Sequence, residues 1–477
     1  MMKSPRDATA QSTCSGGQVS GMQNVNRPMW TFICSINQPM PRKRPQALPS
    51  LLQAALAVVL LLSSVASAQI TSAENLGVFL GGSVKTTDTP ATAPQVPTSS
   101  AKVFEANPGP WGKLLCAYVY LEAPQSLIEE FPLPSPTPRW TFPLSFKSNL
   151  PEFFSKAGLP QSLVDLLMED KRLVVEANGQ FLHVLPPPEE LENISPESRA
   201  IIYAELAKYP ENEYHADPVL IIGTTVEEWY KGSKLRPELI GKIKKLSYMR
   251  GETTAFSDIP LLLNYAQSDS EARGIFKACT RTRNLMIRLK LDKTSNAEEI
   301  IKYWSFGVGI RRKDLEPLIQ SVIELDGVDD VGISHILPAL ARKLLYTYPG
   351  LDMAKHGIMP DCHWTSLNFF KFEPHEYLLD ARLATSQVLE QFIPVEPPYQ
   401  FGDVLFFLDN DTGDAFHSCV YLADNIVYTK NGRNILSPWV IMRLEDVKKV
   451  YLYKGNGRVQ GFRRKDIAAA KAAQKSQ

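Results

Sequence analysis

The sequence has few cysteines, and none of them form a CxxC pair. Six cysteines occur in 477 residues, and none are spaced as a zinc site or a paired redox motif requires. This excludes a small disulfide-stapled fold, and we expect no metal site. One disulfide between Cys116 and Cys279 stays open as a possibility.

The chain also lacks an excess of charge of one sign. Lys and Arg total 51 and Asp and Glu total 51, so no net field attracts nucleic acid or an anionic membrane. No glycine-rich phosphate loop is present, and we expect no cofactor. Basic residues gather only near the C-terminus, where we predict a solvated basic tail over residues 455–477. Nothing in the sequence indicates the oligomeric state.

No apolar run is long enough for a comfortable membrane span. The longest covers residues 51–62, follows the basic cluster Arg42–Arg44 and precedes Ala66-Ser67-Ala68. That order is typical of a secretory signal peptide over residues 40–68, cleaved after Ala68; an uncleaved anchor is the alternative. Residues 1–39 would then be a mis-assigned upstream extension, with synthesis starting at Met40. We therefore expect a secreted or periplasmic protein with no stable membrane span.

The chain after Ala68 divides by composition. Cleavage removes six basic residues and one acidic residue and leaves a net charge of about −5, which argues further against nucleic acid as a partner. Residues 69–101 are rich in Ser, Thr and Pro and predict a disordered linker. Residues 102–190 predict a small β-containing region, with a strand at "LLCAYVYLEAP" and a hairpin around Asn178-Gly179.

Residues 191–345 have the spacing of amphipathic helices, and we predict a mostly helical domain there. Ser195-Pro196-Glu197 is a helix start, with apolar residues at helical spacing after it. Further helices are predicted at about 224–231, 236–247, 258–267, 270–278, 296–304, 313–325 and 333–346. No motif assigns a function to residues 102–345.

Residues 346–454 change character again. A helix is predicted from Cys362 and a second one over about 380–392. Strands are then predicted at "FGDVLFFLD", "FHSCVYLAD", "NIVYTKNG", "SPWVIMRL" and "VKKVYLYKG", separated by Asp, Asn and Gly clusters. These strands predict an antiparallel sheet or half-barrel beside the Cys362 helix, and the whole chain is expected to be α+β.

Cys362 is the candidate nucleophile. It follows Asp361, a plausible N-cap, and a thiol in the first turn of a helix is favoured as the thiolate. A nucleophile also needs a base, and His417 opens a later strand from which its ring could reach the helix start. His363 is the rival base, but it would point about 100° away from Cys362. The alternative is that Cys362 is a small buried residue at a helix start.

The segment "YQFGDVLFFLDNDTGDAFHSCVYLADNIVYTKNG" resembles the second half of the NlpC-type cell-wall peptidase family, a branch of the papain-like superfamily. Gly402-Asp403, Phe406-Phe407 and the stretch from His417 to Leu422 match the family pattern, and Asp361-Cys362 lies upstream as the family's Asp-Cys does. The resemblance covers about residues 345–454. It implies a papain-like module in which the nucleophile helix packs on an antiparallel sheet.

The resemblance also implies roles for single residues. Cys362 would be the nucleophile and His417 the base, and Asn431 would orient the imidazole, although Asn431-Gly432 also reads as a hairpin turn. The family's upstream tyrosine at the oxyanion site corresponds to Tyr348. His363, Trp364 and Cys419 would line the cleft. The chain departs from the family at these three positions, where small residues are usual.

The function predicted from these features is an exported cysteine hydrolase that cleaves amide bonds, with peptidoglycan stem peptides as the substrate class implied by the resemblance. One alternative is a non-catalytic exported binding or scaffold protein that keeps a papain-like module. Another is a thiol hydrolase that acts on an ester, a thioester or a lipid amide.

Overall fold

The computed structural model describes residues 103–305, 309–355 and 359–469. The segments predicted as an upstream extension (1–39), a signal peptide (40–68) and a linker (69–101) lie outside the described residues. The strands are β1 (Phe104–Glu105), β2 (Lys113–Leu121), β3 (Trp140–Pro143), β4 (Leu173–Val175), β5 (Phe181–Val184), β6 (Val219–Ile221), β7 (Tyr248–Arg250), β8 (Thr253–Phe256), β9 (Thr282–Lys290), β10 (Asp330–Gly332), β11 (Phe392–Val395), β12 (Val404–Asp409), β13 (Ala415–Ala423), β14 (Ile426–Lys430), β15 (Trp439–Arg443) and β16 (Gly457–Arg464).

The α-helices are α1 (Gln125–Glu130), α2 (Leu150–Lys156), α3 (Gln161–Leu167), α4 (Pro188–Leu191), α5 (Pro196–Leu206), α6 (Glu213–Ala216), α7 (Val226–Trp229), α8 (Pro237–Leu246), α9 (Ile259–Leu263), α10 (Asp269–Cys279), α11 (Ala297–Ser305), α12 (Gly309–Glu324), α13 (Ile333–Ile336), α14 (Ala339–Leu344), α15 (Leu351–Lys355), α16 (Cys362–Leu367), α17 (Ala381–Gln391) and α18 (Leu444–Tyr451). Short 3-10 helices are η3 (Leu144–Asn149), η4 (Asp170–Arg172) and η5 (Glu376–Leu379).

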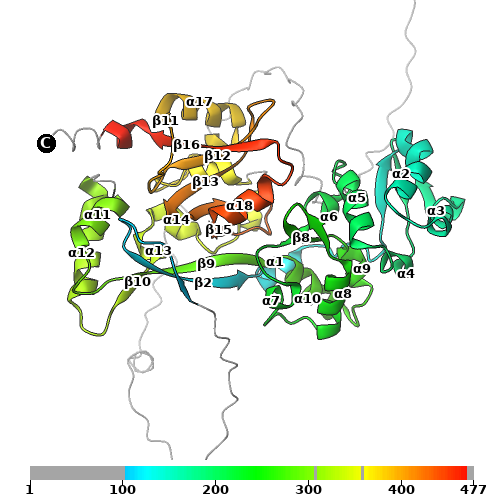
Figure 1. Cartoon of the computed structure of the whole chain (residues 1–477), viewed down its shortest axis with the longest axis horizontal. Helices are drawn as coiled ribbons and strands as arrows, with labels where there is room; N and C mark the ends of the chain where they lie inside the picture. The colour runs from blue at the N-terminus through cyan, green and yellow to red at the C-terminus, as the bar shows by residue number, and fades with distance from the viewer. Residues whose placement is uncertain (1–102, 306–308, 356–358, 470–477) are drawn as a thin grey trace, which may run out of the picture. The chain divides into compact units, whose positions relative to one another are not determined.

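The strands form antiparallel sheets, and helices and strands are mixed along the chain (Figure 1). Every pairing between the named strands is antiparallel. The strand orders are β1-β2-β9-β10, β3-β5-β4, β6-β8-β7 and β11-β16-β12-β13-β14-β15. The coarse prediction of an α+β protein with antiparallel sheets is therefore confirmed.

Several local signals are confirmed by the structure. Asn178-Gly179 lies in the turn of the β4–β5 hairpin, where Gly179 adopts a φ of 69°, a left-handed conformation that suits glycine. The hydroxyl of Ser195 accepts a hydrogen bond from the backbone N–H of Ser198 and so caps α5. The hairpin turn and the helix cap therefore form where the sequence predicts them.

The region 191–345 is less helical than predicted. It contains the β6-β8-β7 sheet and also β9 and β10, so the prediction of a mostly helical domain missed five strands. β9 pairs along its full length with β2, and Figure 1 shows these two strands side by side. Buried and exposed residues alternate near the end of β9, as a sheet with one covered face requires. Pairing with the distant strand β2 therefore stabilises residues 282–290 as a strand.

The C-terminal sheet has two covered faces. Along β12 and β13, Phe407 and Cys419 belong to one buried cluster, whereas Phe406 and Val420 belong to another. Consecutive strand residues point to opposite faces, so each cluster fills one side of the sheet. α16 lies on the second side, where Trp364 and Leu367 join Phe406 and Val420.

Two C-terminal predictions are corrected. The segment "VKKVYLYKG", predicted as a strand, contains α18 up to Tyr451, whose buried residues include Leu444 and Val447 at helical spacing. The predicted basic tail from residue 455 contains β16, which lies inside the sheet between β11 and β12. The basic side chains of this segment led to the prediction of a solvated tail. In the structure, however, Arg463 donates hydrogen bonds to the buried carboxylate of Asp403.

The N-terminal and C-terminal regions are joined through β9. The side chain of Asn284 accepts a hydrogen bond from the backbone N–H of Ile441 at 2.8 Å. The neighbouring Arg283 pairs with Asp446 of α18 at 2.9 Å, and both of these charged side chains are largely buried. Strand β9 therefore supplies polar partners to β15 and α18 of the C-terminal region.

The four cysteines in the described residues, Cys116, Cys279, Cys362 and Cys419, are free and buried. The disulfide between Cys116 and Cys279 that the sequence left open is not formed. Among the helices of the described residues, none combines the length and the apolar character that crossing a bilayer requires.

Glu192, just after α4, makes the stability of the fold depend on pH. It accepts hydrogen bonds from Lys242, Lys245 and Tyr265. Partial burial opposes ionisation, but these donors together lower the pKa of Glu192 to about 2. Because the pKa in the folded state lies below the ordinary value, this stabilisation is present above about pH 4.5 and is lost as the pH falls toward 2.

We expect Glu192→Gln to lower the free energy of unfolding by about 1 kcal/mol at pH 7, since water screens part of the interaction, and by much less near pH 3. Urea unfolding curves at pH 7, 4.5 and 3 measure this difference. Glu189→Gln, which changes an exposed carboxylate on α4, serves as the control. A loss for Glu192→Gln that is the same at pH 7 and pH 3 would contradict the assignment.

Candidate functional site

Cys362 is the first residue of α16, as the sequence predicts. The side chain of Asp361 accepts a hydrogen bond from the backbone N–H of Trp364 at 2.8 Å and so caps the helix. Its second carboxylate oxygen accepts a hydrogen bond from Arg433 at 3.1 Å. Cys362 itself is 5% exposed. The thiol is therefore carried by a well-capped helix start, but it lies beneath other side chains.

Ser418 is the residue of β13 that faces α16. Its hydroxyl donates to the backbone carbonyl of Cys362 at 3.2 Å and lies 3.1 Å from the hydroxyl of Ser366 and 3.1 Å from Nδ1 of His363. Val420, two residues further along β13, is in the same buried cluster as Trp364 of α16. Ser418 and Val420 therefore point toward the helix that carries Cys362.

His417 points to the opposite face of the sheet. Its ring stacks on Tyr451 of α18, with centroids 3.7 Å apart and planes 12° apart, and meets the edge of Phe407. Nε2 lies 3.3 Å from the hydroxyl of Thr429, and Nδ1 is buried without a partner. In the described ranges no hydrogen bond joins the Cys362 thiol to this ring.

This placement differs from the predicted dyad, in which the His417 ring projects toward the start of the Cys362 helix. The reason is the alternation of strand side chains. Ser418 occupies the position that faces α16, and a shift of one residue along β13 would be needed to bring His417 there. No hydrogen bond joins the two predicted groups in the described residues, but burial and the nearby Cys362 thiol raise the pKa of Tyr451, on which the His417 ring stacks. The dyad therefore stays a prediction.

Asn431 does not orient the imidazole. It lies in the connection between β14 and β15, its amide nitrogen donates to the sulfur of Met442 at 3.3 Å, and its amide oxygen is buried without a partner. The next residue, Gly432, adopts a φ of 72°. The turn interpretation of Asn431-Gly432 therefore fits this geometry better than the catalytic one.

Lys430 is the residue whose burial sequence reasoning did not predict. It is fully buried, and its ammonium group donates to the backbone carbonyls of Gly432 at 3.0 Å and Asn434 at 2.7 Å. Burial lowers the pKa of Lys430 to about 7, although the acidic groups of Asp361 and Cys362 oppose the shift. A lysine at the end of the apolar strand "IVYTK" was the available signal for a buried cation.

The predicted cleft residues lie in different surroundings. Trp364 is buried in the core beside Trp439, and Cys419 is fully buried, which together with the nearby Cys362 thiol raises the pKa of Cys419. His363 stacks on Phe406, and burial lowers the pKa of its imidazole. Trp364 and Cys419 therefore fill the interior on opposite sides of the sheet, and His363 is partly buried.

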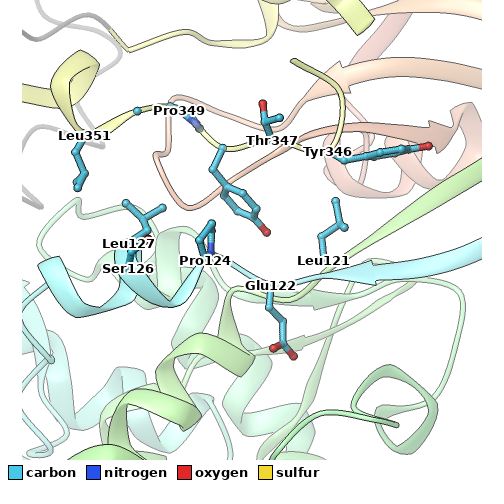
Figure 2. Close-up of a pocket in the computed structure, with 11 residues that line it drawn as sticks. Leu121, Glu122, Pro124, Ser126, Leu127, Tyr346, Thr347, Pro349 and Leu351 are labelled. Carbon is cyan, nitrogen blue, oxygen red and sulfur yellow. The ribbon is translucent and has the colours of Figure 1, made fainter. Parts of the chain in front are cut away.

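Tyr348 belongs to a separate cavity. This cavity of about 520 Å³ is formed by residues 346–351 on one side and, on the other, by Leu121, Glu122, Pro124, Ser126 and Leu127 (Figure 2). Neither Cys362 nor His417 lines it. The structure therefore does not bring Tyr348 into a common site with Cys362.

In chemical terms, the surroundings of Cys362 form a closed polar cluster. The cluster contains a thiol, a buried ammonium group, an ion pair and hydroxyl groups, and its hydrogen bonds link α16 to β13 and the loop after β14. In the part of the chain that the structure describes, no group of three or more His, Cys, Asp or Glu side chains is arranged to hold a metal ion. This hydrogen-bonded cluster can hold α16 in place on the C-terminal sheet.

Comparison with known proteins adds no relative. No protein-family model matches the chain, and neither a curated protein nor a solved structure matches it.

Proposed function

We propose that this chain is an exported, non-catalytic binding protein whose C-terminal region uses a papain-like arrangement of helix and sheet as a scaffold. One observation carries the proposal: His417 is on the face of β13 away from α16, stacked on Tyr451 and bonded to Thr429. In the described residues the Cys362 thiol forms no hydrogen bond to this imidazole, because Nδ1 of His417 is buried without a partner.

The physical argument concerns proton transfer. A general base must come within about 2.6 to 3.2 Å of the proton it removes, directly or through one water. In the described residues His417 is not placed for this transfer, because Nε2 is directed to the hydroxyl of Thr429 and Nδ1 is buried without a hydrogen-bond partner.

We expect Cys362 to react with iodoacetamide at least about 100-fold more slowly than a free thiol at every pH from 6 to 9, because its side chain is buried. Peptide mapping by mass spectrometry after timed alkylation of the native protein measures the reaction at this residue. Full alkylation in denaturant shows that the peptide can be detected. Rapid labelling of native Cys362 at pH 6 would contradict the proposal.

The second candidate is the cysteine hydrolase acting on peptidoglycan stem peptides, with an ester or lipid amide as alternative substrates. Two observations favour it: the Asp361-capped helix start beneath Cys362, and the nearby cation of Lys430. In this mechanism the thiolate of Cys362 attacks an amide carbonyl and backbone N–H groups at the start of α16 hold the oxyanion. The base that has taken the thiol proton would donate it to the leaving amine as the C–N bond breaks, and water would then hydrolyse the thioester of the acyl enzyme.

Digestion of purified peptidoglycan with the wild-type protein and with Cys362→Ala separates the two candidates. We expect no new stem-peptide fragments with either protein. Fragments that appear with the wild type and disappear with Cys362→Ala would establish the hydrolase and remove the binding proposal.

A further inference from the structure

The cavity between residues 121–127 and 346–351 contains a polar group that the protein leaves unused. The hydroxyl of Tyr348 is buried and has no hydrogen-bond partner. Burial, together with the nearby carboxylate of Glu122, raises the pKa of this phenol, so it remains a hydrogen-bond donor at neutral pH. A buried donor without an acceptor is costly and calls for an explanation.

The walls of the cavity are mainly aliphatic. Leu121 and Leu127 come from the end of β2 and from α1, and Pro349 and Leu351 come from the segment after α14. Figure 2 shows Leu127 and Leu351 on opposite sides of one end, and Leu121 beneath Tyr346 at the other. The cavity can therefore cover an apolar body from two sides.

The charge in the cavity is already compensated. Glu122 accepts a hydrogen bond from Arg281 at 2.7 Å, and the Arg281 side chain is 8% exposed. Arg281 also donates to the backbone carbonyl of Lys231. A charged ligand would find no uncompensated partner in this ion pair, so the cavity suits an uncharged one.

The segment that carries Tyr348 is held in a strained conformation. Tyr346 has a φ of 66°, which is unfavourable for a bulky side chain. Its backbone N–H donates to the carbonyl of Trp439 at 2.9 Å, and the N–H of Trp439 donates to the carbonyl of Thr347 at 3.1 Å. The pairing with β15 therefore fixes the backbone immediately before Tyr348 on the rim of the cavity.

We propose that this cavity binds a small uncharged ligand with an aliphatic body and an amide carbonyl, and that Tyr348 donates its hydroxyl hydrogen to that carbonyl. The volume of about 520 Å³ is in the range of small-molecule sites. The assignment goes beyond the proposed function, because the cavity is separate from Cys362 and is compatible with either role of that thiol.

The test uses N-acetyl-L-leucine methylamide as the probe, with ligand-observed NMR on the purified chain. We expect saturable binding with a Kd on the order of 1 mM, as is usual for a ligand of this size. N-acetyl-L-leucine, which carries a carboxylate, is expected to bind at least about fivefold more weakly, since Arg281 is already paired with Glu122. Absence of saturable binding of the methylamide would overturn the proposal.

Three variants locate the site. Ser126→Trp places a large side chain at an exposed position on the cavity wall and should abolish binding, whereas Gln125→Trp, at the adjacent exposed position outside the lining, should leave it unchanged. Tyr348→Phe should weaken binding about three- to tenfold through loss of one hydrogen bond. Equal affinity of Ser126→Trp and the wild type would overturn the site, and equal affinity of Tyr348→Phe and the wild type would overturn the donor role of Tyr348. Neither readout involves Cys362. A failure of the ligand-binding test is therefore distinguishable from a failure of the alkylation test.

Discussion

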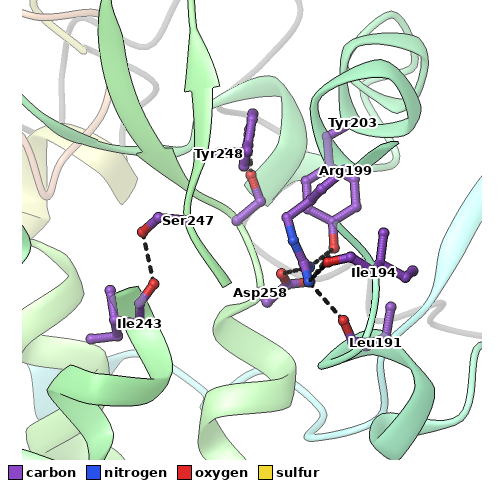
Figure 3. Close-up of polar contacts among 9 residues, drawn as sticks. Leu191, Ile194, Arg199, Tyr203, Ile243, Ser247, Tyr248 and Asp258 are labelled. Atoms are coloured by element: carbon purple, nitrogen blue, oxygen red, sulfur yellow. Dashed lines mark hydrogen bonds and ion pairs between the residues drawn. The ribbon is translucent and has the colours of Figure 1, made fainter. Parts of the chain in front are cut away.

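Asp258→Ala is expected to lower the free energy of unfolding by about 3 to 5 kcal/mol, because it leaves the buried guanidinium of Arg199 without its counter-charge. Arg199 is fully buried in α5, and its Nη1 donates to the Asp258 carboxylate at 2.5 Å. The hydroxyl of Tyr203 donates to the other carboxylate oxygen, also at 2.5 Å. Figure 3 shows these groups converging between α5 and the start of α9.

The other contacts of Arg199 explain why no rearrangement can relieve the loss. Its Nη2 donates to the backbone carbonyl of Leu191 at 2.6 Å, which fixes the guanidinium beneath α4. Tyr203 also packs on Trp140 and His215, so the side chains around the ion pair cannot admit water without opening the core. The charge would remain buried and unpaired.

Guanidinium unfolding followed by tryptophan fluorescence measures the effect. Arg312→Met removes an ion pair with Glu298 at a partly exposed position and should cost less than about 1 kcal/mol. The double variant Arg199→Met with Asp258→Leu should recover most of the stability, because both buried charges are then absent. A double variant as unstable as Asp258→Ala would show that packing, rather than the unpaired charge, causes the loss.

Arg463→Met is expected to lower the free energy of unfolding by about 3 kcal/mol. Arg463 on β16 forms two parallel hydrogen bonds to Asp403, from Nε at 2.7 Å and from Nη2 at 2.6 Å. Asp403 is 1% exposed and also accepts a hydrogen bond from the backbone N–H of Gln400. The substitution would leave this carboxylate buried with only that backbone donor.

The adjacent residue provides a matched control. Arg464 pairs with Asp466 at a partly exposed position, so Arg464→Met should cost less than about 1 kcal/mol. Both variants remove one positive charge from the same strand, but Arg463→Met leaves a buried carboxylate behind and Arg464→Met leaves an exposed one. Losses of equal size would mean that β16 is not anchored through Asp403.

The sequence predicted features that depend on neighbouring residues. Asp361 and Ser195 cap helices, and Asn178-Gly179 turns a hairpin, because each side chain or backbone acts on groups within three residues. The antiparallel character of the C-terminal strands was also readable, since Asp, Asn and Gly clusters separate them.

The sequence did not predict features that depend on distant partners. Which face of the sheet His417 occupies is set by the packing of α16 over Ser418, and no local pattern contains that information. Strand β16 was hidden because the partner of Arg463 lies 60 residues earlier in the chain. Strand β9 was missed because its pairing with β2 spans the intervening helices and sheets.

The contacts made by β9 also bear on how this protein can change over time. One buried cluster contains Leu285, Ile287 and Leu289 of β9 as well as Val420 and Trp439 from the C-terminal region. A boundary drawn at residue 345 would pass through that common interior. The two regions therefore cannot be exchanged, shortened or recombined independently, and a substitution that alters the volume of one side has to be accommodated by the other.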